Sequence, residues 1–393
     1  MQIYNISKMK KNVNIELENR VDEHLKKHLK KEKYIQGKST ALLDDIYSIE
    51  SNTIHQCILV DYKTIKNTEI KEDKLKIVNG ARVEFNDFRN CTFKNIKFKK
   101  CTFFGTKFSK CVFENIIFEE CVFFKDNNIV IFNEGSLLKK TSFEKCNIRK
   151  SIFKNITFEY MKFLESTLKE SIIANGSVLN LKIIDCDCRM FNIVNSNVDK
   201  IIFEDEYNTK FDEYTFFDQI IVNQNYKKSY ENASKVYREI AVKFEKNNLL
   251  DYAGEYYYLS KKAECKSLSG IDRVKSWIYW MLCGYGERPT YALITSVEII
   301  LIFAIIYMFT GLIADGSLIN YTDLFSNGIV YQPDMYRDFF KSLYFSITTF
   351  TTVGYGDITP VGEISTMLSG IEMFLGVTMV GIWTATLARK IIR

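Results

Sequence analysis

Two long apolar segments dominate the C-terminal part of the chain. Residues 291–313 carry one charge, Glu298, and residues 364–388 carry one charge, Glu372. Roughly 20 apolar residues cross the hydrocarbon core of a bilayer, so both segments are predicted to be transmembrane helices. Segment 337–350, which is amphipathic at its start and apolar at its end, lies between them and is too short to span, which predicts a re-entrant helix.

A different pattern, with a period of five, governs residues 81–205. Period five is neither the 3.6 of a helix nor the 2 of a strand. A second small or apolar residue, such as Cys91 or Ile96, stands two positions before each periodic one. Residues two apart share one face of a short extended step, and the chain must turn a corner before the next step. Repeated steps of this kind predict a solenoid whose coils stack at strand spacing. The periodic residues run from Phe88 to Phe123 and, after an irregular stretch at 124–140, from Phe143 to Phe203.

This pattern resembles the pentapeptide-repeat family over about 125 residues. The resemblance implies that residues 76–205 form a right-handed quadrilateral β-helix with four steps per coil. The chain departs from the family in using Phe rather than Leu at the centre, and in the large inward residues Ile96, Ile116 and Ile156. Such solenoids can act as interaction surfaces, which leaves an unknown cytoplasmic ligand or protein partner to be identified.

Four cysteines at 91, 101, 111 and 121 follow the five-residue period. Coils of four steps would stack them in pairs, which suggests a metal site. Buried cysteine also packs as a small hydrophobe, and this interpretation is preferred here. Residues 81–125 contain nine Lys and Arg against five Asp and Glu, so mimicry of DNA by an acidic face is disfavoured and no nucleic-acid partner is expected.

The segments that flank the solenoid have helical spacing. Residues 206–286 are predicted to form a helical linker, with stripes at Val236, Ile240 and Phe244 and at Ala253, Tyr257 and Leu259, separated by a break at 247–248. The aromatic and apolar strip 277–282 then lies beside basic residues and is predicted to lie along the inner membrane surface. The Gly-Tyr-Gly at 284–286 is predicted to bend the chain into the membrane. The Lys-rich residues 1–75 hold all three histidines, His24, His28 and His55, which are interpreted as part of a solvated helix face.

A second Gly-Tyr-Gly has a different setting. Residues 351–357 read TTVGYGD and lie between the re-entrant segment and the last apolar segment. This order of span, re-entrant helix, TVGYGD and span resembles the two-transmembrane potassium channel pore over about residues 290–393, within a predicted pore domain of residues 287–393. The resemblance implies a selectivity filter at 352–356, in which backbone carbonyls replace the hydration shell of K⁺. The carbonyls of Thr352, Val353, Gly354 and Tyr355 would bind the ion, and Gly354 and Gly356 would supply positive φ angles.

The same resemblance assigns further roles. One chain supplies one wall of the filter, so a homotetramer is expected. Asp357 would lie at the outer mouth. Thr348 stands where some members carry Glu, which removes the basis for an acidic pair with Asp357. Gly376 is either the hinge of the inner helix or a site of close helix packing. The cavity and gate would be lined by Val377, Val380, Thr384 and Ala388. Glu298 and Glu372 are carboxylates within the spans, which need partners that the sequence does not identify.

Charge and composition predict where the protein lies in the cell, and they argue against a secretory signal and against disulfides. Basic residues flank both spans, which predicts a cell-membrane protein with two spans and with cytoplasmic N- and C-termini, in contact with lipid. The opening residues MQIYNISKMKKNVN hold no apolar run, so no secretory signal is expected. All ten cysteines precede the first span and are expected to be reduced thiols. The abundance of Lys, Asn and Ile suggests a bacterial source.

Together these patterns predict a multidomain potassium channel. No catalytic constellation is visible, so no enzyme and no cofactor is expected apart from K⁺ as the permeant ion. No helix with Arg at every third position is present, so gating or assembly is expected to act through the N-terminal solenoid. The alternatives are a membrane-anchored interaction scaffold with a silent pore, a weakly selective cation channel, and a channel that is constitutively open.

Overall fold

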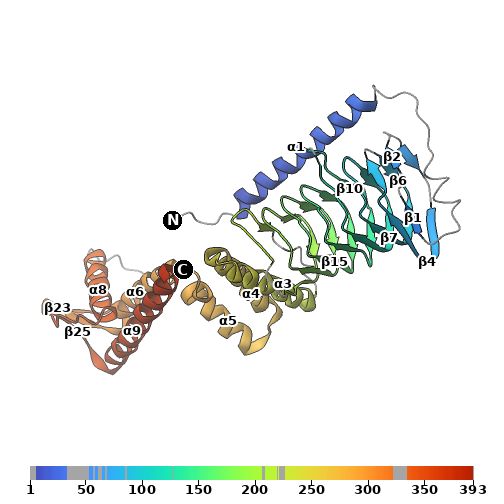
Figure 1. The fold of residues 1–393 in the computed structure, drawn as a ribbon. Coiled ribbons are helices and arrows are strands. Elements are labelled where there is room, and N and C mark those ends of the chain that lie inside the picture. The colour runs from blue at the N-terminus through green and yellow to red at the C-terminus, as the bar shows by residue number, and fades with distance from the viewer. Residues whose placement is uncertain are drawn as a thin grey trace. The chain divides into compact units, whose positions relative to one another are not determined.

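The chain forms two units in a computed structural model, Met1–Ser267 and Leu268–Arg393. The first unit holds α1, a solenoid of short strands, and the helices α3 and α4 (Figure 1). The second holds α5, α6, α8 and α9. The structure describes residues 6–32, 53–55, 58–60, 64–66, 69–84, 86–125, 127–205, 209–218, 220, 226–321 and 334–392.

The solenoid is built from parallel strands that stack coil on coil. One sheet of twelve strands contains the order β20-β17-β14-β11-β9-β12-β15-β18-β21, and a second sheet of eight has the order β22-β19-β16-β13-β10-β8-β6-β3. This stacking confirms the predicted β-solenoid. The strands are β1 (Thr53–His55), β2 (Ile58–Val60), β3 (Thr64–Lys66), β4 (Glu69–Asn79), β5 (Arg82–Glu84), β6 (Asp87–Arg89), β7 (Thr92–Lys99), β8 (Lys107–Ser109), β9 (Val112–Glu119), β10 (Ile131–Asn133), β11 (Leu137–Lys139), β12 (Ser142–Glu144), β13 (Ile152–Lys154), β14 (Thr157–Glu159), β15 (Met161–Leu164), β16 (Ile172–Ala174), β17 (Ser177–Val178), β18 (Leu181–Ile184), β19 (Asn192–Val194), β20 (Asn197–Val198), β21 (Ile201–Phe203) and β22 (Phe216–Phe217).

Stacked positions on successive coils are 20 residues apart, as in the side-chain hydrogen bond between Asn95 and Asn115. Other coils are longer: the Cys111 amide bonds the Ser136 hydroxyl 25 residues ahead, and Asn192 pairs with Phe216, 24 residues ahead. The irregular stretch at 124–140 therefore adds residues without losing the stacking. It also supplies Leu138, five residues before Phe143, and Phe132, which lies off the five-residue count, to the core.

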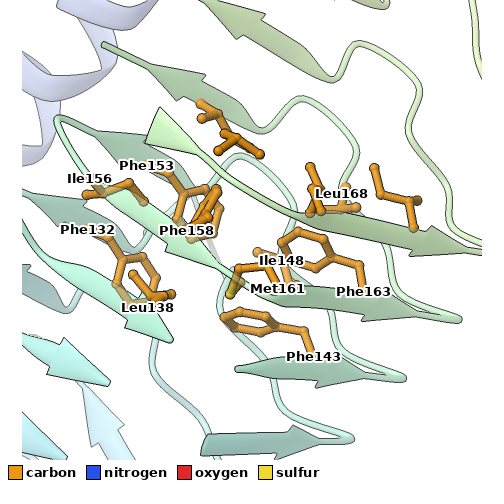
Figure 2. Packing of buried hydrophobic residues seen from close by; sticks show 14 of the residues in the cluster. Phe132, Leu138, Phe143, Ile148, Phe153, Ile156, Phe158, Met161, Phe163 and Leu168 are labelled. Carbon is orange, nitrogen blue, oxygen red and sulfur yellow. The ribbon is translucent and has the colours of Figure 1, made fainter. Parts of the chain in front are cut away.

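The interior is a set of aromatic ladders that run along the solenoid axis (Figure 2). Phe98, Phe118, Phe143 and Phe163 stack in sequence with ring centroids 5.2, 4.8 and 5.2 Å apart. Rings in neighbouring ladders meet edge to face, which is the arrangement that aromatic quadrupoles favour. The large inward residues Ile96, Ile116 and Ile156 are all buried, and the first two lie inside the long strands β7 and β9.

The cysteine thiols belong to this core. Most of the solenoid thiols donate a weak hydrogen bond to a backbone carbonyl, for example Cys121 Sγ to the Phe98 oxygen at 3.3 Å and Cys146 Sγ to the Phe118 oxygen at 3.2 Å. Burial raises the pKa of the Cys186 thiol to about 12, which keeps it protonated at neutral pH. These contacts favour packing over metal binding for the thiols.

Left-handed backbone at the corners lets the chain turn between steps. Non-glycine residues adopt positive φ at intervals of five, as at Asn95 (56°), Lys100 (53°) and Lys110 (55°). An L-residue in this region costs about 1–2 kcal/mol, and Asn tolerates it better than most other residues. The corners thus explain a feature of the sequence that the inward pattern leaves open, namely the frequent Asn and Gly between steps.

Helix α1 (Ile6–Glu32) packs on an outer face of the solenoid, so its interpretation as a solvated helix was wrong. Val13 and Leu17 lie in one apolar cluster with outward-facing isoleucines of the eight-stranded sheet, Ile131, Ile152 and Ile172. His24 is only 5% exposed. The solvated-helix interpretation failed because the five-residue period identifies only the inward-facing residues of the solenoid. The contact with α1 is made by apolar residues at outward-facing positions. The side chains of His28 and His55 lie outside the described residues.

The predicted helical hairpin is confirmed and covers the last coil. It consists of α3 (Lys227–Lys246) and α4 (Leu250–Ser267), with Asn247 and Asn248 between them. The Tyr256 hydroxyl accepts from the Phe217 amide at 2.9 Å and donates to the Phe217 carbonyl at 2.8 Å, so it pairs the final strand. The buried stripe of α4 includes Ala253 and Tyr256, whereas the expected Tyr257 and Leu259 are partly buried. Solenoids need such caps because their end coils otherwise expose the core.

The second unit is mostly helical. Its elements are α5 (Gly270–Cys283), the short 3₁₀ turn η1 (Gly284–Gly286), α6 (Pro289–Thr310), β23 (Leu312–Ala314), β24 (Ser317–Ile319), α8 (Met335–Phe350), β25 (Ile358–Pro360) and α9 (Gly362–Ile392). Helix α5 exposes an apolar face that includes Trp277 and Ile278, and its position at a membrane surface stays a prediction. The three short strands form one antiparallel sheet that the sequence did not predict.

The corner geometry generates a stability prediction at Tyr160, an exposed residue with φ of 57°. Substitution Tyr160→Asn is expected to raise the free energy of unfolding of the solenoid by about 0.5–1 kcal/mol, because Asn tolerates left-handed backbone. Thermal unfolding of the full-length protein in detergent, followed by the β-sheet circular dichroism signal, measures this. Tyr214, which is also exposed but has no positive φ, is the matched control, and Tyr214→Asn should not stabilise. Equal effects at both positions would refute the explanation.

Candidate functional site

Helices α6, α8 and α9 pack around a small apolar core in the second unit. Phe303, Tyr307 and Met308 of α6 and Phe345 of α8 are buried together, with Leu375 of α9 packed against them. Both α6 and the part of α9 from Gly362 to Ile391 are long and apolar enough to cross a membrane, with mean hydropathies of 2.4 and 1.5. Helix α8 is held between them and leads directly into residues 352–356, here called the filter segment.

The filter segment is fixed to the last turn of α8 by backbone hydrogen bonds. The Thr348 carbonyl accepts from the amides of Val353 at 2.9 Å and Gly354 at 3.2 Å. Positive φ occurs at Gly354 (50°) and Gly356 (79°), as predicted. An added Cβ at either glycine would meet nothing within 4 Å, so backbone conformation rather than space requires glycine there. Thr352 also has positive φ, 60°, which the sequence did not predict.

The side chains of the filter segment are exposed on a single chain, Val353 to 53% and Tyr355 to 72%. The Tyr355 ring is nonetheless backed by α8, because it stacks on Tyr344 with centroids 6.4 Å apart and planes within 6°. Thr348, where a Glu would stand in some related pores, donates its hydroxyl to the Phe345 carbonyl of its own helix at 3.0 Å. Asp357 follows the filter segment and interacts with the Tyr344 hydroxyl.

The small sheet ties the outer end of the filter segment to α6. Strand β25, which begins one residue after Asp357, pairs with β23, which follows α6. The same region is held to α8 by Lys341 Nζ and Asp315 Oδ2 at 2.8 Å and by a hydrogen bond of 2.7 Å from the Tyr321 hydroxyl to Asp338 Oδ2. Lys341 lowers the pKa of Asp315. The filter segment is therefore anchored on both sides.

Glu372, whose partners the sequence did not identify, lies fully buried between three helices. The Tyr307 hydroxyl of α6 donates to its Oε2 at 2.7 Å, and its Oε1 hydrogen-bonds Ser346 Oγ of α8. Glu298, the other carboxylate within the apolar segments, is exposed on α6 in the single chain. The sequence analysis did not identify Tyr307 and Ser346 as partners because a tyrosine or a serine is not unusual in such a helix. The only signal in the sequence was Glu372 itself, a carboxylate within an apolar segment.

Gly376 lies one turn after Glu372 and packs against the end of α8. A Cβ built at Gly376 would fall 1.9 Å from the Phe350 carbonyl oxygen, a distance that no side chain can occupy. This contact supplies a packing reason for glycine, and a hinge at Gly376 stays a prediction.

The residues predicted for the cavity and gate share one face of α9. Val377 and Val380 are 60% and 52% exposed in the single chain, and Thr384 and Ala388 are exposed on the same side. The opposite side, with Met379, packs on Ala292 and Phe350.

The first Gly-Tyr-Gly forms a buried bend between α5 and α6, as predicted. Gly284, Tyr285 and Gly286 all have positive φ, and all three are buried. The bend also contacts the C-terminal end of α9, because Glu287 Oε1 lies 3.1 Å from Arg389 Nη2. Glu287 is nearly covered, whereas Arg389 is half exposed.

Substitution Gly376→Ala is expected to destabilise the second unit by about 1–3 kcal/mol, since the new methyl group must push α8 and α9 apart. The melting temperature of the full-length protein in detergent measures this. Gly370 lies on the same helix with nothing within 4 Å of an added Cβ, so Gly370→Ala is expected to be neutral or stabilising. Equal destabilisation by both substitutions would contradict the packing argument.

Charge reversal tests the ion pair at the bend. Glu287→Arg alone and Arg389→Glu alone are each expected to lower the melting temperature, because each places like charges together at a partly covered site. The double variant should recover most of the loss. Lys390→Glu, at the neighbouring position, serves as the control for net charge, and a double variant no better than the singles would show that the pair does not hold the two elements together.

Comparisons with known proteins agree with both parts of the chain. Residues 322–393 match the family model described as ion channel, and residues 88–128 match the model for pentapeptide repeats. Over 52 residues the chain is 35% identical to the calcium-gated potassium channel TvoK of Thermoplasma volcanium, an alignment that covers 13% of this chain and 15% of that protein.

Among solved structures, a trypsin-treated form of QnrB1, a plasmid-mediated fluoroquinolone resistance protein, matches with a TM-score of 0.21 and 14% identity over 42% of this chain and 79% of that chain. Full-length QnrB1 gives a TM-score of 0.11 and 13% identity over 41% of this chain and 94% of that chain. The fold of the repeat region follows from its own strand register. The chain thus combines a pentapeptide-repeat solenoid with a C-terminal part that matches the ion-channel family over residues 322–393 and holds two helices long and apolar enough to cross a membrane.

Proposed function

We propose that this protein is a potassium-selective channel that works as a homotetramer. The observation that carries the proposal is the filter segment itself: TVGYG, with positive φ at both glycines, attached to the C-terminal end of a short helix between two candidate membrane helices. Potassium filters use rings of backbone carbonyls from four such loops. The similarity to TvoK, a calcium-gated potassium channel, supports the same ion.

The tetramer follows from what a single chain leaves uncovered. Irregular backbone at membrane depth is tolerated only where protein buries it or where it lines a wet cavity. Filter segments on four chains would cover one another around an axis and present their carbonyls to the ion. The C-terminal end of α8, with its partial negative charge, would favour a cation nearby.

The remaining roles follow from this arrangement. K⁺ would bind at the carbonyls of Thr352, Val353, Gly354 and Tyr355, and Asp357 would lie at the outer mouth. The exposed face of α9 from Val377 to Ala388 would line the inner cavity and gate. Basic residues at both ends of the pore domain favour cytoplasmic termini, on the positive-inside rule.

The solenoid is proposed to regulate or assemble the channel from the cytoplasmic side. Its long stacked core and its capping hairpin make it a stiff body, and α4 precedes α5 directly in the sequence. Its charged surface is largely self-compensated, with pairs such as Lys99 and Glu119 at 2.8 Å. A scaffold with a silent pore is the second candidate, and only a flux measurement separates the two.

The test is ion flux from liposomes that contain the purified full-length protein. Flux of K⁺ without flux of Na⁺ is expected, together with tetramers by native mass spectrometry. Gly354→Ala should abolish flux, because Ala resists positive φ at that position. Ser317→Ala, in the outer hairpin, is the control. The same assay on a chain that starts at Leu268 reports whether the first unit changes the flux.

Each other outcome selects an alternative. Equal flux of both ions would indicate a weakly selective cation channel. Intact tetramers without flux would favour the scaffold. Identical flux from full-length and shortened chains would remove the solenoid from gating.

A further inference from the structure

The hydrogen bonds around Glu372 form a chain across three helices. The Tyr307 hydroxyl donates to Glu372 Oε2, and Glu372 Oε1 is bonded to Ser346 Oγ. Ser346 Oγ also contacts the Ile300 carbonyl oxygen of α6 at 2.9 Å. Tyr307, Ser346 and Glu372 are all fully buried, so water does not supply further partners from bulk solvent.

Counting protons decides which groups donate. A hydroxyl has one proton, and a carbonyl oxygen can only accept. The Ser346 proton is therefore committed to the Ile300 carbonyl, and the Tyr307 proton is committed to Glu372 Oε2. The bond between Glu372 Oε1 and Ser346 Oγ then needs a proton of its own, and the carboxyl group is the remaining source. A neutral Glu372 satisfies every bond in the chain with one proton each.

The surroundings of Glu372 favour the same state. A buried carboxylate without a cation is costly, and the cost is greatest within a membrane. Among the described residues, the polar groups that face Glu372 are Tyr307 from α6 and Ser346 from α8, and neither is a cation. Its neighbours one turn away on α9 are Leu368, Ser369, Leu375 and Gly376.

We propose that Glu372 is held in its protonated form, and that it positions the pore helix α8 through the relay Tyr307–Glu372–Ser346–Ile300. The position matters because α8 carries the filter segment. Ser346 lies opposite Glu372, and Phe350 lies opposite Gly376, so two contacts one helical turn apart fix α8 along α9. The Thr348 carbonyl that holds Val353 and Gly354 lies between them.

The consequence for ion flux rests on the proposed channel function. Loss of the proton at high pH would leave a buried charge and break the bond to Ser346. Flux through the wild-type channel should therefore fall as the pH rises. Glu372→Gln keeps a donor and an acceptor without a proton to lose, and it should restore flux while removing this pH dependence. Glu372→Ala, which leaves buried donors unpaired, should reduce flux roughly ten- to hundredfold.

The direct test is infrared difference spectroscopy of the full-length protein in liposomes. The wild type is expected to show the carbonyl stretch of a protonated carboxyl group at neutral pH, and Glu372→Gln should lack that band. Glu363→Gln, at the start of α9, is the control and should keep it. The spectrum needs no ion flux, so it stays informative even if the proposed function fails.

The outcomes divide cleanly. A wild-type spectrum without the band, or a band that survives Glu372→Gln, would overturn the proposal. So would a Glu372→Gln channel with the same pH dependence as the wild type. A band that is lost in Glu372→Gln while the wild type conducts no ions would keep the protonated relay and reject the channel function.

Discussion

The second unit depends on the close approach of α8 to α9. At Gly376 the backbone of α9 meets the Phe350 carbonyl of α8 with no room for a side chain. The position of α8 sets the position of the filter segment, because the Thr352 amide donates to the Thr349 carbonyl and the Val353 and Gly354 amides donate to the Thr348 carbonyl. The outer sheet fixes the other end through β25. Helix α8 is too short to span a membrane, so its position is set by contacts with neighbouring elements.

The two units differ in how they use polar groups. The solenoid satisfies its backbone through parallel ladders and leaves paired charges on the surface, such as Lys94 with Glu114 and Lys99 with Glu119. Exposed pairs of this kind add little stability, but they prevent a surface of one sign. The second unit instead buries its polar groups among helices, as at Glu372 and Ser346. There, a missing partner would be far more costly.

Features with a local repeat could be predicted from the sequence, and features that join distant segments could not. The five-residue period predicted the coils because each inward residue is set by its own step. The apolar segments and TVGYG predicted the helices and the order of the second unit. The packing of α1 was missed because the five-residue period identifies only residues that face the interior. Outward-facing isoleucines such as Ile152, which contact α1, do not follow that period. The partners of Glu372 were missed because Tyr307 lies 65 residues away. Strands β23 and β25 were missed because three residues carry too little pattern.

The two ends of α9 are held by different contacts, one to α8 at Gly376 and one to the bend before α6 at Arg389. The segment of α9 from Gly376 to Arg389 is about 20 Å long at 1.5 Å per residue. A bend of about 10° at Gly376 would carry the far end sideways by roughly 3 Å over that length. Arg389 meets Glu287 at 3.1 Å, so such a swing would separate the pair. A small rotation at Gly376 would thus break the ion pair between Arg389 and Glu287, at the bend that leads into α6.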